Sequence, residues 1–188
     1  MELTFNLGDF VARTKLILKS PAKAFDKIEK EKGVNKALSY YIALTLISVV
    51  LGILFTYIVV PLLIPIFPDT LVSPEPLSVE GLINILVIYL VDVILSFVVG
   101  GILFLWLKVF RGKREFAKAY QLYVYSQTPN MLLRVFPYLS LVGWIYSMYL
   151  LMLGTVNLYK LTWVKAVLMY IIPLAMMYYL AINFTPAV

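Results

Sequence analysis

Hydrophobic residues are gathered into five long stretches along this chain, and short polar connectors separate them. A helix needs about 20 largely apolar residues to cross the roughly 30 Å hydrocarbon core of a bilayer. Each stretch comes close to that length or exceeds it. The pattern predicts membrane-spanning helices over residues 37–60, 82–107, 117–135, 138–158 and 163–184.

The third stretch is the least apolar of the five. Four polar residues interrupt it, namely Gln121, Gln127, Asn130 and Arg134. It is retained as a span because its omission would move every basic residue downstream to the wrong side of the membrane. The expected fold is therefore all-α: a polytopic integral membrane protein whose residues 37–188 form a five-helix transmembrane bundle.

Lysines and arginines are plentiful in alternate connectors and scarce in the others. Residues 1–36 are strongly basic, whereas the connector from Pro61 to Glu80 contains no Lys or Arg. The connector from Lys108 to Lys118 is basic again. Because Lys and Arg near span ends are retained in the cytoplasm, the pattern predicts a cell-membrane protein with a cytoplasmic amino terminus and an external carboxyl terminus.

Residues 1–36 are too charged to insert into a bilayer, yet they carry apolar side chains at helical spacing. These are Leu7, Phe10, Val11, Ile17 and Leu18. Ser20 followed by Pro21 is typical of a helix start, so two short amphipathic helices are expected in a cytoplasmic segment. They either lie along the cytoplasmic leaflet as an anchor or pack on the ends of the spans, and both readings stay open.

A lipid-facing segment would need apolar and basic side chains at the membrane surface. The residues expected to make such contacts are Phe10, Arg13, Lys15, Lys19, Lys113 and Arg114.

The composition narrows the classes of function. The chain has 188 residues, of which 62% are hydrophobic and 14% charged, and positive-inside retention accounts for its net charge of +6. Nucleic-acid binding is not expected. The absence of Cys and His excludes thiolate nucleophiles and His/Cys zinc sites, so no metal or cofactor is expected. An intramembrane aspartyl protease needs two carboxylates, but only Asp92 lies in an apolar stretch, and we expect no enzyme.

Asp92 is expected to face the bundle interior, because a charge at mid-membrane costs about 2.5 to 3.5 kcal/mol. The third span supplies a ridge of polar side chains as possible partners. We expect Asp92 to accept a hydrogen bond from Gln127 or Asn130 and to form an ion pair with Arg134, in a cluster that is either structural or a transport pathway.

Pro129 predicts a kink in the third span, which is either ordinary helix shaping or a hinge.

Small residues mark two helix faces at four-residue spacing. Ser96 and Gly100 share the face of Asp92, and Ser48 with Gly52 forms a similar face on the first span. Such faces allow close helix approach, so the first two spans are predicted to pack there.

Several short motifs resemble a known family. They are Ser20-Pro21-Ala22-Lys23-Ala24-Phe25, Lys118-Ala119-Tyr120, Tyr125-Ser126-Gln127-Thr128-Pro129, Phe136-Pro137 and Gly143-Trp144-Ile145-Tyr146-Ser147. They look like the Yip domain, the Ypt/Rab-interacting family of multi-span membrane proteins. The resemblance implies five spans, a cytoplasmic amino terminus and, for eukaryotic members, roles in vesicle traffic, membrane shaping and contact with Rab GTPases. The composition and brevity of this chain look more like prokaryotic or archaeal members.

The expected function is that of a non-enzymatic membrane protein that organises membrane or recruits partners. The alternatives are a small transporter or channel that uses the polar cluster, and a structural subunit of a membrane complex. The expected partners are membrane lipids, including anionic ones, and a protein such as a small GTPase, another membrane protein or a second copy of the chain.

Overall fold

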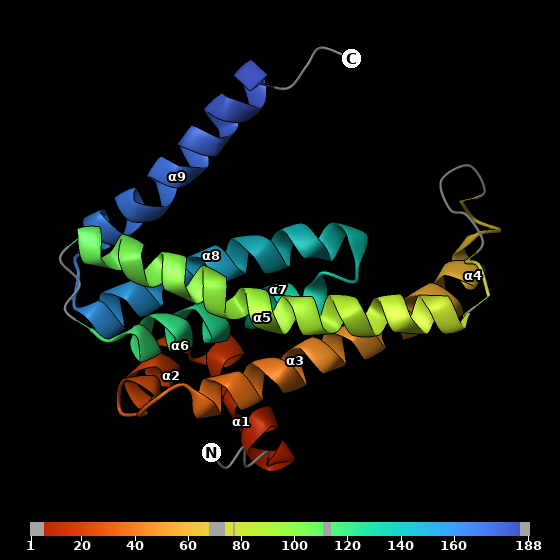
Figure 1. Ribbon diagram of the computed structural model, residues 1–188, viewed down its shortest axis with the longest axis horizontal. Coiled ribbons are helices and arrows are strands. Elements are labelled where there is room, and N and C mark those ends of the chain that lie inside the picture. The colour runs from red at the N-terminus through yellow and green to blue at the C-terminus, as the bar shows by residue number, and fades with distance from the viewer. Residues whose placement is uncertain (1–5, 68–73, 77, 111–113, 185–188) are drawn as a thin grey trace.

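The computed structural model describes residues 6–67, 74–76, 78–110 and 114–184, without the side chains of residues 174 and 176–184. All regular structure in these ranges is helical (Figure 1). The elements are α1 (Leu7–Lys19), α2 (Pro21–Glu29), α3 (Asn35–Leu54), the π-helical turn η1 (Phe55–Val59), α4 (Val60–Leu63), α5 (Val79–Val109), α6 (Phe116–Ser126), α7 (Thr128–Leu133), α8 (Pro137–Tyr159) and α9 (Trp163–Phe184).

Three helices are long and apolar enough to cross a membrane. They occupy Asn35–Leu63, Val79–Val109 and Pro137–Tyr159, and a shorter apolar helix covers Trp163–Pro173. These helices indicate a multi-pass membrane protein. They contain the predicted spans 37–60, 82–107 and 138–158. The first helix runs past the predicted end at residue 60, because Pro61 lies in the first turn of α4, where a missing amide donor is tolerated.

The predicted span 117–135 is two helices and not one. α6 ends at Ser126, α7 begins at Thr128, and Gln127 lies at the break. Pro129 cannot donate a hydrogen bond to the Tyr125 carbonyl, and the Thr128 hydroxyl donates to that carbonyl instead, at 2.8 Å. The helix is therefore interrupted at a point where a side chain replaces the missing backbone donor.

The long helices lie side by side, with α6 and α7 packed among them (Figure 1). α1 and α2 lie against the end of the bundle where α3 begins, and α9 runs away from it in Figure 1. α9 is attached near its start, where the Tyr170 hydroxyl lies 2.7 Å from Thr155 Oγ1 and the Trp106 indole donates to the Met169 carbonyl at 3.0 Å.

The small face of α5 receives a tyrosine from α6 rather than the small face of α3. Tyr120 lies 3.0 Å from the Ser96 hydroxyl, and its Cδ2 is 2.9 Å from the position that a Cβ would take at Gly100. No atom lies within 4 Å of a Cβ built at Gly52. The predicted packing of Ser48 and Gly52 against Ser96 and Gly100 is therefore wrong, because the gap left by the small residues of α5 is filled by an aromatic ring.

The packed core is confined to the part of the bundle nearest α1 and α2. All buried residues of α3 lie between Ala37 and Ser48, and all buried residues of α5 lie between Ser96 and Leu107. η1 and α4 contain no buried residue. The remaining parts, α3 after Ser48 and α5 before Ser96, are called the distal halves below.

Candidate functional site

The two N-terminal helices are docked on the bundle through apolar side chains. Ile17 of α1 and Phe25 and Ile28 of α2 are buried. Gly154 of α8 makes room for the Phe25 ring, two atoms of which lie 2.7 Å from the position that a Cβ would take. The break between the helices falls at Ser20, as predicted, although the Ser20 side chain makes no capping hydrogen bond.

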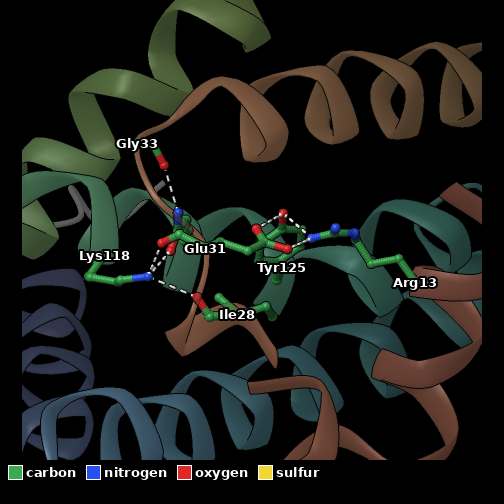
Figure 2. Close-up of polar contacts among 7 residues, drawn as sticks. Arg13, Ile28, Glu31, Gly33, Lys118 and Tyr125 are labelled. Atoms are coloured by element: carbon green, nitrogen blue, oxygen red, sulfur yellow. Dashed lines mark hydrogen bonds and ion pairs between the residues drawn. The ribbon is translucent and has the colours of Figure 1, made fainter. Parts of the chain in front are cut away.

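A set of polar contacts, which we call the docking network, holds the same helices in place. It consists of Arg13, Glu31, Lys118, Gln121 and Tyr125 (Figure 2). Arg13 Nη1 donates to the Glu31 carboxylate and to the Tyr125 hydroxyl, and Tyr125 donates to Glu31 Oε2 at 2.9 Å. The guanidinium carbon of Arg13 also lies 5.1 Å from the centre of the Tyr125 ring. These three side chains form a closed ring of contacts between α1, the segment after α2, and α6.

Arg13 stays charged in this position. Burial by itself lowers the pKa of the guanidinium, but attraction to Tyr125 and Glu31 outweighs burial, and the pKa of Arg13 is raised. Removing Arg13 would therefore leave the largely buried Glu31 carboxylate, among the described residues, with the Tyr125 hydroxyl as its one remaining side-chain partner.

Lys118 and Gln121 donate hydrogen bonds to backbone carbonyls in the last turn of α2 and in the segment between α2 and α3. The Lys118 ammonium donates to the carbonyls of Ile28, at 2.8 Å, and of Glu31, as Figure 2 shows. Gln121 donates to the Gly33 carbonyl at 2.6 Å, and Gly33 adopts a positive φ of 67°. Carbonyls at helix ends lack intrahelical donors, and α6 supplies them here.

Glu29, at the end of α2, is paired with two cations from other elements. Arg114 Nη2 and Lys160 Nζ lie 2.6 and 3.0 Å from its carboxylate oxygens. Arg114 Nε also donates to the Leu158 carbonyl of α8, at 3.0 Å. The hydrogen bond from Lys160, with the attraction of both cations, holds the pKa of Glu29 below its usual value.

Tyr40 of α3 connects α1 to α7. Its hydroxyl lies 3.0 Å from Thr14 Oγ1 and 3.0 Å from Thr128 Oγ1. Its ring centre lies 5.0 Å from that of Phe10.

The expected lipid-contact residues fall into different environments. Phe10 is buried beside Tyr40, and Arg13 belongs to the docking network, so both differ from the expected surface contact because the bundle covers them. Arg114 is held by Glu29 and Leu158. Lys113 lies outside the described residues. Of the six residues, Lys15 and Lys19 are exposed on α1, and their contact with lipid stays a prediction.

A second polar site lies where the core ends. Arg134 Nη1 is 3.3 Å from Asp92 Oδ2, and Arg134 Nε donates to the Ser48 hydroxyl at 2.8 Å. The Asn130 side-chain amide donates to Gln127 Oε1 at 3.1 Å, and its backbone amide donates to Ser147 Oγ at 3.1 Å. No hydrogen bond joins Gln127 or Asn130 to Asp92 in the described part of the chain. Asn130 is therefore part of the α7–α8 contact, and Arg134 alone pairs with Asp92.

Sequence reasoning missed the docking network. Glu31, Lys118 and Tyr125 are far apart in the chain, and Glu31 looks like one more charge in a basic segment. The only local signal is that Lys118 and Tyr125 fall in the motifs that resemble the Yip domain. Among the described residues, no group of three or more Asp, Glu, His or Cys side chains could hold a metal ion.

Comparison with protein families identifies the chain. Residues 15–184 match the Yip1 domain, which confirms the resemblance seen in the short motifs. No curated protein and no solved structure matches the chain. The Yip1 family is linked to vesicle trafficking, is known for interactions with Rab GTPases and is generally non-enzymatic. The match covers nearly the whole chain, including every helix from α2 to α9, the Asp92–Arg134 pair and Glu31, Lys118 and Tyr125 of the docking network. This chain therefore belongs to the Yip1 domain family.

Proposed function

We propose that this protein is a non-enzymatic membrane organiser that crosses the membrane five times and presents α1 and α2 at the cytoplasmic leaflet. There the two helices contact lipid and recruit a partner. Two findings support this proposal: the chain belongs to the Yip1 domain family, and α1 is bonded to the helix bundle.

The observation that carries this proposal is that α1 has two apolar sides. Phe10 and Ile17 are buried against the bundle, whereas Leu7 and Val11 are each more than half exposed. Lys15 and Lys19, one and two turns after Val11, are exposed as well. An exposed apolar stripe next to lysines is typical of a helix that lies at a membrane surface, where apolar side chains enter the acyl boundary and lysines meet anionic headgroups.

The docking network gives the surface helix a mechanical role. A helix tethered by a flexible linker would only anchor the chain, but α1 is bonded to α6 through Arg13 and Tyr125 and to α8 through the Tyr146 hydroxyl, which donates to the Leu18 carbonyl at 2.8 Å. A force that lipid or a partner protein exerts on α1 is therefore transmitted to the bundle. This coupling suits a protein that shapes or marks a membrane.

Five crossings are supported by helix lengths. α6 and α7 together cover residues 116–133, about 27 Å at roughly 1.5 Å per residue, and the 22 residues of α9 cover about 33 Å. Both are near the hydrocarbon thickness of roughly 30 Å. An odd number of crossings with the basic segment inside leaves the carboxyl terminus outside.

Transport through the polar cluster is the weaker alternative. Arg134 is already paired with Asp92, and Asn130 is hydrogen-bonded to Gln127 and Ser147, so each of these groups has at least one partner within the protein. They support a structural role for the cluster.

The lipid contact of α1 is tested on the full-length protein in nanodiscs. Val11→Cys and Ala12→Cys, each labelled with a polarity-sensitive fluorophore, place the probe on adjacent residues of α1 that point about 100° apart. The Val11 probe should emit at shorter wavelength and be quenched by a quencher in the acyl region, and anionic lipid should strengthen the effect. Equal, water-like emission from both probes would overturn the proposal.

Partner recruitment is tested by affinity purification of the full-length protein from native membranes. A small GTPase or another cytoplasmic protein should be recovered with the wild type and lost with Lys15→Glu/Lys19→Glu. If the same proteins are recovered with both forms, α1 is not the recruiting surface.

A further inference from the structure

The Asp92–Arg134 pair stands at the boundary between the packed core and the distal halves of α3 and α5. Ser48, which binds Arg134, is the last buried residue of α3, and Ser96, one turn from Asp92, is the first buried residue of α5. The pair is therefore covered from one side only. The Arg134 side chain is 36% exposed and that of Asp92 is 29% exposed.

Both side chains retain unused hydrogen-bonding atoms. Within the described residues, Asp92 Oδ1 accepts no hydrogen bond and Arg134 Nη2 donates none. In water these atoms would be hydrated, but in a bilayer they face hydrocarbon. Charged groups at membrane depth normally face a protein interior or a water-filled cavity. A single copy of this chain leaves the pair open to lipid.

We propose that a second copy of the chain covers this pair. In this dimer, the exposed flank of α5 beside Asp92 packs against the same flank of the second copy, so that the Asp92 carboxylate of each copy faces the Arg134 guanidinium of the other. The inference rests on the proposed membrane-spanning arrangement, because the pair needs covering only if it lies in the bilayer.

Charge complementarity selects a second copy as the occupant. The pair places one negative and one positive group side by side on the same surface, and a two-fold axis along the membrane normal brings each group opposite its counterpart. The four charges then form a closed and neutral set, and the unused oxygen and nitrogen atoms gain partners. A phospholipid headgroup or a different membrane protein is the competing occupant.

The exposed flank of α5 can be identified from helical geometry. Ile88 and Leu95 lie one turn before and after Asp92, and both are exposed. Leu90 is also exposed but points to the other flank of α5, about 160° away from Asp92 at roughly 100° per residue. Ile88 and Leu90 are 60% and 50% exposed and lie close in depth, so they make a matched pair of probes.

The first experiment uses single cysteines, since the natural chain has none. Ile88→Cys and Leu90→Cys proteins are treated with a short bifunctional thiol reagent in native membranes. Ile88→Cys should give a cross-linked dimer several-fold more abundant than that of Leu90→Cys. Equal or absent cross-linking of the two would overturn the proposed interface and leave a lipid or another protein as the cover.

The second experiment reverses charges in the Ile88→Cys background. Asp92→Arg creates two positive charges and Arg134→Asp creates two negative charges, so each variant alone should lose the cross-link by like-charge repulsion. Differently tagged copies of the two variants, produced together, should cross-link with each other. Rescue in the mixture shows that each variant folds, whereas cross-linking of either variant alone at the wild-type level would overturn the intermolecular pairing.

If the mixture also fails to cross-link, a variant that removes the charge of Asp92 without reversing it tests the role of the pair. Asp92→Asn in the Ile88→Cys background keeps the shape of the side chain and should cross-link several-fold less than the wild type. Cross-linking that is unchanged in Asp92→Asn would overturn the role given to the pair.

A separate measurement distinguishes failure of this inference from failure of the membrane arrangement. A membrane-impermeant maleimide should leave Ile88→Cys unlabelled in sealed and in opened membranes, because this position is proposed to lie in lipid. Labelling in either preparation would contradict the spanning arrangement itself. Protection from labelling without cross-linking would overturn the dimer alone.

Discussion

Phe25 on α2 packs directly on Gly154 of α8, with two ring carbons 2.7 Å from the position that a Cβ would take at this glycine. Leu122 of α6 lies even closer to the same position, and both side chains are buried. The contact joins an N-terminal helix, the broken helix and a long apolar helix at one point. A methyl group has no room there.

The Gly154→Ala substitution should therefore destabilise the protein. The buried Phe25 and Leu122 side chains must move, and overpacking of a tight core typically costs about 1 to 3 kcal/mol. Thermal unfolding in detergent measures the effect. Gly101→Ala is the control, because no atom lies within 4 Å of its Cβ position, and alanine there should leave the melting temperature equal or raise it. Equal behaviour of the two variants would contradict the close packing at Gly154.

Arg13→Gln should loosen α1. The substitution removes a charged donor shared by Glu31 and Tyr125, and hydrogen bonds to charged groups contribute about 1.5 to 3 kcal/mol. Amide hydrogen exchange of α1 should become faster by about tenfold or more, since roughly 1.4 kcal/mol corresponds to a factor of ten. In detergent, where no anionic headgroup is present, Lys15→Gln changes an exposed charge on the same helix and should leave the exchange rates unchanged. Similar rates in both variants would mean that Arg13 does not hold α1.

Trp106 and Pro173 should be energetically coupled. Pro173 has no amide hydrogen for the Met169 carbonyl one turn earlier, and the Trp106 indole donates to that carbonyl instead. Trp106→Phe should cost about 1 to 3 kcal/mol in the wild type and less in a Pro173→Ala background, where the backbone donor is restored. Melting temperatures of the four proteins in this double-mutant cycle measure the coupling. The same cost in both backgrounds would show that the indole contact is unimportant.

The ion pairs of Glu29 should give a pH-dependent contribution to stability. Because Lys160 and Arg114 lower the pKa of Glu29 in the folded state, their contribution is present above the ordinary value of 4.5 and is lost as the pH falls through the lowered pKa. Glu29→Gln should therefore melt at a lower temperature than the wild type at neutral pH, and the gap should close as the pH falls below 4.5. Since Glu29 lies at the surface, the gap is expected to be small and to shrink in high salt. A gap that stays constant with pH would contradict this role.

The sequence predicts well those features that depend on one segment at a time. Three of the long helices follow from hydropathy, and the break between α1 and α2 follows from Ser20-Pro21. The cost of an isolated charge in lipid predicts a partner for Asp92, and the Arg134 guanidinium does lie 3.3 Å from it. Pro129 predicts a kink in the third span, and the helix is interrupted just before it, where α6 ends at Ser126 and α7 begins at Thr128.

Features that depend on which segments of the chain contact one another cannot be predicted from one segment at a time. Ser96 and Gly100 leave a gap that either a small-residue helix face or an aromatic ring can fill, and only the arrangement of α6 puts Tyr120 there. Glu31 meets Lys118 and Tyr125 across almost half the chain, so no local spacing links them. The same is true of Phe10, whose apolar character fits both a lipid surface and the buried position that it occupies.

The central claim is that the chain crosses the membrane five times, with α1 and α2 on the cytoplasmic side. The most direct measurement is the accessibility of a tag fused after Val188, compared with one fused before Met1, in intact cells and after permeabilisation. The account predicts that the tag after Val188 is reached by an external antibody in intact cells and that the tag before Met1 is reached only after permeabilisation. A carboxyl-terminal tag that needs permeabilisation would contradict the five-fold crossing.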